Sequence, residues 1–363
     1  MLLLRWLTFG LAFALAAGIA SAQPSTAASV GIFDAYGDVG SPAITGSTSY
    51  DDETQSYEMT AGGTNMWADR DEFQFAWKQM TGDFILQARV EFIGEGVDPH
   101  RKSGIVVRPG RDADAPYIDG VIHGDGLTSM QYRRTKGGQT EQILQAISGA
   151  DVLQLERRGR TYIFSAAKYG EPFSSVETAD IKLGDDVLVG LALCSHNPAV
   201  TERAVFRDVR LTVPVSPDFV PYRDYIGSVL EILDLETGHR REIARSEQPF
   251  EAPNWTTDGN ALIYNASGRD EGWGGLYRFD LATRRATLID TGAQNRNNND
   301  HVLSFDGRFL AISDQGDASG GASTIYTVPV EGGTPKRLTT DSPSYAHGWP
   351  PVKTMYLPSG DQP

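Results

Sequence analysis

Short runs in which apolar and polar residues alternate recur from residue 30 to residue 214. Four clear examples are Phe84–Phe92, Ser103–Arg108, Val152–Glu156 and Tyr162–Ser165. Each run is bounded by Gly, Asp, Asn or Pro, and no long stretch shows the 3.6-residue apolar period of an amphipathic helix. The pattern predicts an all-β sandwich of many short strands over residues 30–214.

A proline-rich segment and then a repeat follow the predicted sandwich. The nine residues Val213–Pro221 contain three prolines. They predict a stiff, extended linker over residues 215–224. After it, Asn254–Tyr264 matches Val302–Ile312, and each copy places an Asp-Gly pair between two apolar runs. A second element, a strand followed by a turn and a polar strand, recurs in the same register. A repeat period in the forties is typical of β-propeller blades, so we predict an incomplete propeller over residues 225–363.

Charge and cysteine content exclude several classes of function. The formal net charge is −15, which disfavours a nucleic-acid binder because such proteins carry a basic surface. The single cysteine, Cys194, excludes an intramolecular disulfide framework and a Cys-cluster zinc site. It follows an apolar run, which indicates a buried, unreactive thiol.

The first 22 residues have the pattern of a secretory signal peptide. A short basic start is followed by an apolar run, and Ala20-Ser21-Ala22 supplies small residues for cleavage between Ala22 and Gln23. The alternative is a membrane anchor, but the run is shorter than the ~20 residues that span a bilayer. We therefore predict an exported chain, periplasmic or secreted, with no membrane span after cleavage.

The repeat resembles the blades of TolB-like, WD-type β-propellers of exported bacterial proteins. Trp255–Gly259 and Ser304–Gly307 carry the Asp-Gly blade motif. The resemblance covers about 225–349 and implies the fold, with little about function. Only about three blades of sequence are present, whereas propellers close with roughly 4–8 blades. We therefore expect a partial propeller, and we treat truncation of the chain near Trp349 as a hypothesis.

The region before the linker resembles concanavalin-like, laminin-G-like jelly-roll modules. The stretches that carry this resemblance are Ser47–Tyr57, Met66–Phe73, Thr81–Phe84, Ser103–Arg108 and Val189–His196. Such modules often bind glycans, although the fold alone does not establish this. Trp67, Tyr117 and Tyr132 are the candidates for stacking on sugar rings, and their alternative role is in the core.

Equivalent blade positions supply the second group of candidates. Aligning the repeats gives one ligand- or partner-binding set near the propeller axis, made of Glu251, Asn254, Asp300, His301 and His347. His301 and His347 are equivalent in this alignment and could hold a divalent metal ion as a cofactor. The alternative is a polar plug that fills the channel. The pair also resembles the metal-binding histidines of exported oligogalacturonate lyase propellers.

An acidic loop region offers a further possibility. Oxygen-rich loops on a sandwich rim can hold Ca²⁺, and the residues concerned are Asp112, Asp114, Asp119, His123 and Asp125. Aspartates in Gly-rich loops more often serve turns. The sequence contains no His-Glu-x-x-His, Gly-x-Ser-x-Gly or P-loop motif.

These observations favour an exported, non-catalytic recognition protein. Its sandwich would bind a glycan or an envelope partner, and its propeller would present a protein-binding face. One alternative is a carbohydrate-active enzyme, similar to a polysaccharide lyase, with a metal held by the propeller histidines. The other alternative is an inactive truncated fragment.

Overall fold

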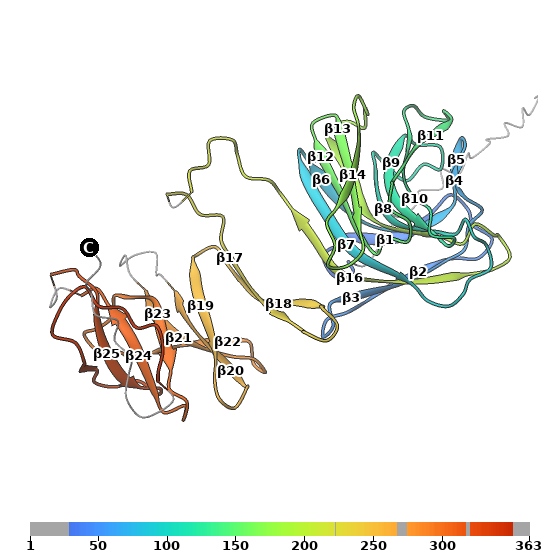
Figure 1. Cartoon of the computed structure of the whole chain (residues 1–363). Helices are drawn as coiled ribbons and strands as arrows, with labels where there is room; N and C mark the ends of the chain where they lie inside the picture. Colours follow the sequence, from blue (N-terminus) through green and yellow to red (C-terminus); the bar gives the residue numbers. More distant parts are fainter. Residues whose placement is uncertain (1–28, 222, 267–273, 317–319, 351–363) are drawn as a thin grey trace, which may run out of the picture.

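A computed structural model describes residues 29–221, 223–266, 274–316 and 320–350 (Figure 1). The described residues form only β-strands and irregular segments, so the chain is all-β, with a sandwich followed by a propeller-like part. The predicted signal peptide, with Ala22 and Gln23, lies outside the described residues. The described part of the 215–224 segment contains no strand.

The sandwich consists of two seven-stranded antiparallel sheets. The first sheet has the order β1 (Ala35–Val39), β6 (Phe73–Thr81), β15 (Asp186–Cys194), β8 (Lys102–Arg108), β9 (Tyr117–His123), β10 (Thr128–Arg133) and β11 (Thr140–Leu144). The second has the order β14 (Ser174–Thr178), β13 (Thr161–Ala167), β12 (Val152–Arg158), β7 (Phe84–Phe92), β16 (Glu202–Thr212), β3 (Ser56–Ala61) and β2 (Ser47–Asp51). A small hairpin, β4 (Met66–Trp67) and β5 (Arg70–Asp71), lies outside both sheets.

Alternation along the strands explains how the sheets pack. On β7, Phe84, Leu86 and Ala88 are fully buried between the two sheets, while the residues between them face outward and are partly exposed. Strands β8, β9 and β10 are buried on both faces. The β4–β5 hairpin accounts for part of this cover, because Met66 packs with Val106 and Tyr117 on the face that points away from the main core. Polar side chains on that face are therefore buried as well.

The propeller-like part begins with a two-stranded sheet and continues with two four-stranded sheets. The strands of the first are β17 (Ser228–Leu233) and β18 (Arg240–Ser246). The next sheet contains β19 (Phe250–Trp255), β20 (Ala261–Ala266), β21 (Gly275–Asp280) and β22 (Arg285–Ile289), and the last contains β23 (Asn297–Leu303), β24 (Phe309–Asp314), β25 (Thr324–Pro329) and β26 (Lys336–Arg337).

The Asp-Gly pairs form equivalent tight turns, as the repeat predicts. Gly259 and Gly307 both have φ of +70°, a conformation that favours glycine. The carboxylate of Asp258 accepts the Asn260 amide at 3.1 Å, and its hydrogen bonds, led by that from Thr256, lower the pKa of Asp258 to about 2. The two four-stranded sheets are therefore structural copies of one repeat.

Neighbouring blades pack through their first strands and their apolar faces. Strand β23 contacts both β19 and β20, and Ile263, Leu276, Leu310 and Ile312 form a shared buried cluster. Further along the chain, the indole Nε1 of Trp349 donates to the carbonyl of Val302 at 2.9 Å. The segment that ends at Trp349 thus lies against the last described sheet.

Replacing Trp349 by phenylalanine tests the contact with that sheet. The Val302 carbonyl loses its donor while most of the ring remains, so the free energy of unfolding should fall by about 1 kcal/mol in urea titrations. Trp255→Phe is the matched control, because the half-exposed Trp255 side chain has no hydrogen bond in the described structure. Equal stability losses in the two variants would show that the indole hydrogen bond contributes nothing.

Candidate functional site

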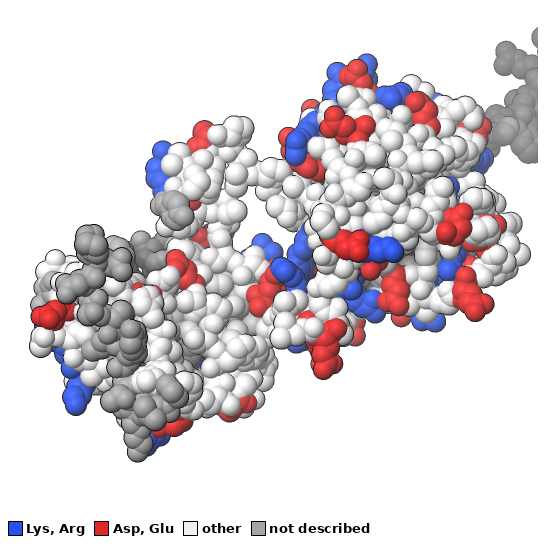
Figure 2. Space-filling model, viewed as in Figure 1, with Lys and Arg blue, Asp and Glu red and all other residues white. Residues whose placement is uncertain are grey.

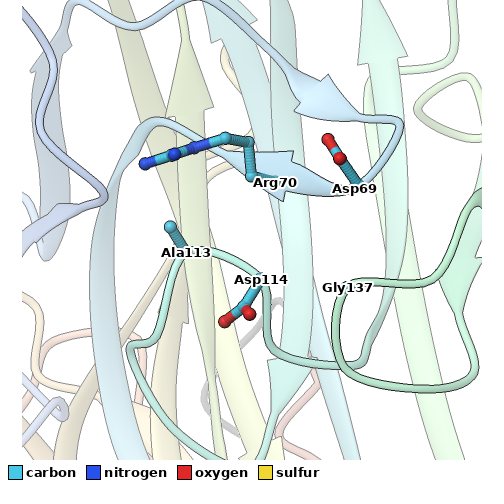
Figure 3. Close-up of a pocket in the computed structure, with 5 residues that line it drawn as sticks. All are labelled: Asp69, Arg70, Ala113, Asp114 and Gly137. Carbon is cyan, nitrogen blue, oxygen red and sulfur yellow. The ribbon is translucent and has the colours of Figure 1, made fainter.

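An open polar pocket lies on the sandwich where three loops meet (Figure 3). Its volume is about 340 Å³. The lining residues are Asp69, Arg70, Ala113, Asp114 and Gly137. They come from the β4–β5 hairpin, the β8–β9 loop and the β10–β11 turn, three segments that are far apart in the sequence.

One buried guanidinium group connects all three walls of the pocket. The side chain of Arg133, at the end of β10, is fully buried. It donates to the carbonyl of Ala68 at 3.1 Å, to that of Ala115 at 2.9 Å and to that of Gly138 at 3.1 Å. It also forms a two-pronged ion pair with the carboxylate of Asp71, at 2.9 and 2.8 Å. Arg133 therefore fixes the β4–β5 turn and both neighbouring loops relative to one another.

A second arginine completes a buried charge cluster beneath the pocket. Arg108 lies 3.4 Å from the Asp71 carboxylate and donates to the carbonyl of Asp112 at 2.5 Å. Burial raises the pKa of Asp71, and hydrogen bonding to Arg133 acts in the opposite direction. Because isolated charges are costly to bury, this carboxylate depends on its arginine partners. We refer to Asp71, Arg108 and Arg133 as the charge cluster.

Two charged side chains at the pocket form no hydrogen bond or ion pair within the described structure. Asp69 and Arg70 are exposed, and no hydrogen bond or ion pair links either side chain to the residues of the described ranges. Asp114, in contrast, pairs with Lys136 at 3.1 Å. Figure 3 shows the side chains of Asp69, Arg70 and Asp114 around the same opening. The pocket therefore offers both a free donor group and a free acceptor group.

The aromatic candidates occupy places that differ from the prediction. Tyr117 and Tyr132 are only 1% and 6% exposed. Tyr117 packs under the β4–β5 hairpin and its hydroxyl donates to the Met66 carbonyl at 3.1 Å, while Tyr132 faces the core between the sheets. The prediction that these two rings stack on a sugar is wrong for this reason. Trp67 is partly buried next to the pocket, with the Lys102 ammonium 5.6 Å from its ring centre.

Several other polar side chains are buried on the same sheet face. His123 is 7% exposed, and burial, with Lys102 as the next cause, lowers its pKa to about 3. The fully buried Asp119 accepts the Gln131 amide at 3.1 Å. The rings of His100 and His123 meet edge to face, with centroids 5.9 Å apart. These groups lie in or beside the sheet that supports the pocket.

The propeller candidates do not form one site. His301 is 2% exposed and its Nε2 lies 3.2 Å from the carbonyl of Ile263, whereas His347 is exposed. Burial lowers the pKa of His301. The amide of Asn254 donates to the His301 carbonyl at 3.2 Å, so these two residues are neighbours. Glu251 is exposed on β19.

Metal binding finds no support at either predicted place. Asp300 bonds to Asn298, with its amide donating to the Asn298 side chain at 2.9 Å. In the acidic loop, Asp112 and Asp114 both bond to Lys136, and the Asp125 carboxylate accepts the Leu127 amide at 3.0 Å. Across the described ranges, no three His, Cys, Asp or Glu side chains are grouped as metal ligands would be.

Sequence reasoning missed the charge cluster. Arg133 and Asp71 are 62 residues apart and belong to different segments. The single local signal is an arginine at the end of a strand that is buried at every position. Such a residue needs a buried partner, but the pattern does not identify it.

No family model matches the chain. An uncharacterized protein of Agrobacterium fabrum is 42% identical over 125 residues, which are 34% of this chain and 40% of that protein. The chain thus spans well under half the length of this curated relative. A solved structure described as a putative TolB from Agrobacterium tumefaciens is 40% identical, with a TM-score of 0.31 over 35% of this chain and 43% of that one.

A carbohydrate-binding module of Bacillus subtilis, CBM66, also matches. It is 13% identical, with a TM-score of 0.34 over 52% of this chain and 98% of that one. TM-scores of this size do not by themselves establish a common fold, so the sandwich is defined by its own two sheets. In the described ranges, no helix has the length and apolar character needed to cross a bilayer.

Proposed function

We propose that the chain is an exported, non-catalytic recognition protein whose sandwich binds a glycan in the pocket at Asp69 and Arg70. The observation that carries this proposal is the pair of exposed charges, Asp69 and Arg70, on the hairpin wall that Arg133 fixes to the two neighbouring loops. A sugar presents neighbouring hydroxyl groups that both donate and accept, and an arginine and a carboxylate that line one pocket match that pattern.

The size and rigidity of the pocket support the same proposal. Its volume of about 340 Å³ lies within the roughly 300–1,000 Å³ of small-molecule sites. Because buried hydrogen bonds already hold the three walls, little conformational entropy is lost when a ligand binds. Only Asp114 among the acidic lining residues is engaged, with Lys136, which leaves Asp69 and Arg70 to contact the ligand.

The propeller-like part would contribute a protein-binding face. It carries large apolar side chains that are strongly exposed, among them Leu288 at 58% and Phe305 at 73%. Exposed apolar side chains of this size are typical of protein-interaction surfaces when they cluster. An envelope protein is the partner we propose for this face. Figure 2 shows acidic and basic side chains interspersed on one face of the molecule, which does not match the basic surface of a nucleic-acid binder.

Glycan binding can be tested directly with the pocket variants. The chain without residues 1–22 is screened on a glycan array, and the best oligosaccharide is titrated by calorimetry. Arg70→Ala and Asp69→Ala should each weaken binding about tenfold or more, because each removes a charge-assisted hydrogen bond. Arg160→Ala is the matched control, since Arg160 is an exposed arginine that pairs with Asp180 elsewhere on the sandwich.

Two outcomes would contradict the proposal. One is binding that Arg70→Ala and Arg160→Ala leave equally unchanged. The other is cleavage of the bound oligosaccharide, seen as shorter products by mass spectrometry, which would favour the enzyme alternative over a recognition role.

A further inference from the structure

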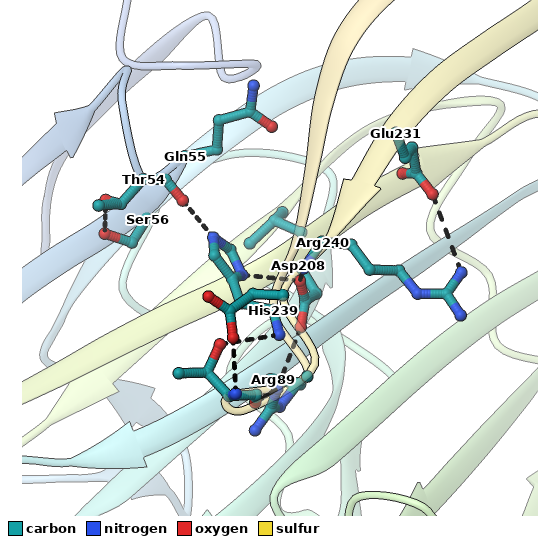
Figure 4. Close-up of polar contacts among 12 residues, drawn as sticks. Thr54, Gln55, Ser56, Arg89, Asp208, Glu231, His239 and Arg240 are labelled. Atoms are coloured by element: carbon teal, nitrogen blue, oxygen red, sulfur yellow. Dashed lines mark hydrogen bonds and ion pairs between the residues drawn. The ribbon is translucent and has the colours of Figure 1, made fainter. Parts of the chain in front are cut away.

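The first hairpin of the propeller-like part rests on the outer face of the sandwich. The β17–β18 turn contacts β7, β16 and the β2–β3 turn, as the polar contacts in Figure 4 show. Tyr169 also donates to the carbonyl of Gly238 at 2.9 Å. We call this set of contacts between the hairpin and the sandwich the joint.

A β-bulge in β16 aims an acidic side chain at the joint. The register of β16 against β7 shifts between Arg207 and Arg210, and Asp208 has φ of +52°. Bulges redirect side chains out of a regular sheet. Here one Asp208 oxygen accepts the Arg240 amide at 2.7 Å and lies 2.9 Å from Nδ1 of His239. The other oxygen lies 3.4 Å from the guanidinium of Arg89.

His239 faces a hydrogen-bond acceptor with each of its ring nitrogens. Nδ1 faces the Asp208 carboxylate, and Nε2 faces the backbone carbonyl of Thr54. A neutral imidazole has one N–H and can satisfy only one of these acceptors, whereas the charged ring has two. The geometry therefore fits the protonated form of His239.

The arrangement does not resemble a hydrolytic triad. In a triad, the histidine nitrogen remote from the carboxylate faces a hydroxyl group. Here that nitrogen faces a carbonyl, and the Thr54 hydroxyl bonds to the Ser56 hydroxyl at 2.8 Å. His239 thus serves to hold two parts of the chain together.

We propose that the joint is a proton-controlled latch. Protonated His239 donates one hydrogen bond to the Asp208 carboxylate and one to the Thr54 carbonyl, and neutral His239 keeps only one of the two. Histidine is the side chain whose charge ordinarily changes between about pH 5 and 8. Loss of the ring proton leaves either the Asp208 carboxylate or the Thr54 carbonyl without a donor. The propeller-like part then becomes less firmly fixed relative to the sandwich.

The charged groups around His239 come from every element of the joint. The nearby carboxylates are Asp208 on β16 and Asp234 in the hairpin turn, and Arg89 on β7 lies 3.4 Å from Asp208. The Arg240 guanidinium lies 3.8 Å from Glu231 instead. Arg241 of β18 donates to the carbonyl of Glu53 in the β2–β3 turn. The two acceptors that face the ring decide which form of the histidine fits.

Other contacts in the joint do not involve this histidine directly. Arg210 pairs with Glu231 at 2.8 Å, and Gln55 exchanges two hydrogen bonds with the backbone of Glu242, at 2.6 and 2.9 Å. These contacts keep the hairpin near the sandwich when the ring is neutral. The latch therefore changes how often the joint opens and does not separate the parts completely.

Hydrogen exchange of the full chain tests the latch. The Glu242 amide donates to Gln55 across the joint, so its protection factor reports opening. We expect the protection factor to be about tenfold higher at pH 5.5 than at pH 8, since one charge-assisted hydrogen bond is lost on deprotonation. The amide of Ile105, in the buried strand β8, should show no gain in protection at pH 5.5, because it reports the stability of the sandwich and not the joint.

Two variants separate the latch from general effects of pH. His239→Asn removes the second ring donor and should abolish the difference between pH 5.5 and pH 8. His347→Asn, the same change at an exposed histidine, should retain it. An unchanged pH difference in His239→Asn would overturn the proposal, as would equal protection at both pH values in the wild-type chain. If Ile105 shows that His239→Asn unfolds the sandwich, Asp208→Asn serves as the second variant and must also reduce the difference.

Discussion

Replacing Arg133 by alanine should lower the free energy of unfolding of the sandwich by about 3–5 kcal/mol. The Asp71 carboxylate, which is 1% exposed, would then lose its two-pronged partner and keep only Arg108 at 3.4 Å. The carbonyls of Ala68 and Ala115 would also lose their donors. Urea unfolding followed by circular dichroism measures the loss.

The neighbouring arginine provides the control for this variant. Arg134 is partly exposed and pairs with Glu141 at 3.1 Å on the surface. Surface ion pairs contribute little, so Arg134→Ala should cost no more than about 1 kcal/mol. A loss of less than about 1 kcal/mol for Arg133→Ala would show that the charge cluster does not hold the pocket walls.

Stability at acid pH should depend strongly on His123. Burial lowers the pKa of His123 to about 3 in the folded chain. In the unfolded chain a histidine has its ordinary pKa of about 6.5. Between these values, the unfolded chain binds a proton that the folded chain does not. Above about pH 6.5 this ring therefore does not change the free energy of unfolding with pH. As the pH is lowered further, the free energy of unfolding falls by about 1.4 kcal/mol per pH unit.

A variant without the imidazole isolates this contribution. His123→Gln keeps a polar side chain of similar length and removes the titrating ring, so its stability should fall less steeply between pH 6.5 and pH 4. His347→Gln, at an exposed position, should retain the wild-type slope. The account of His123 is wrong if unfolding free energies of His123→Gln and the wild-type chain fall in parallel over this range.

Alternation and repetition in the sequence predicted the fold class. The alternating run at Phe84–Phe92 became a strand with one fully buried face, because a period of two places apolar residues on one side of a sheet. The Asp-Gly repeat became two equivalent hairpin turns, with φ of +70° at both Gly259 and Gly307. The predicted count of about three blades corresponds to two four-stranded sheets and one two-stranded sheet in the described residues.

The sites could not be predicted in the same way, because they depend on which segments meet in space. Tyr117 and Tyr132 alternate as strand residues do, but the sequence does not show that the β4–β5 hairpin covers one ring and the opposite sheet covers the other. His301 and His347 occupy equivalent repeat positions, yet one is buried against Ile263 and the other is exposed. Equivalent positions in a repeat do not ensure equivalent surroundings.

The joint illustrates the same limit at the level of a single residue. Asp208 lies in a strand that alternates regularly, and only the bulge turns its carboxylate toward His239. A bulge of one residue leaves little trace in a hydrophobic pattern. The pairing of Asp208 and His239 depends on how the β17–β18 hairpin lies on the sandwich, which the sequence pattern does not indicate.

The most direct test of the recognition role is a crystal structure of the chain with its best-binding oligosaccharide from the array. The account predicts a sugar ring in the pocket, with hydroxyl groups within hydrogen-bond distance of the Asp69 carboxylate and the Arg70 guanidinium, and walls unchanged around Arg133. An oligosaccharide bound elsewhere on the chain, with this pocket empty at saturating ligand, would contradict it.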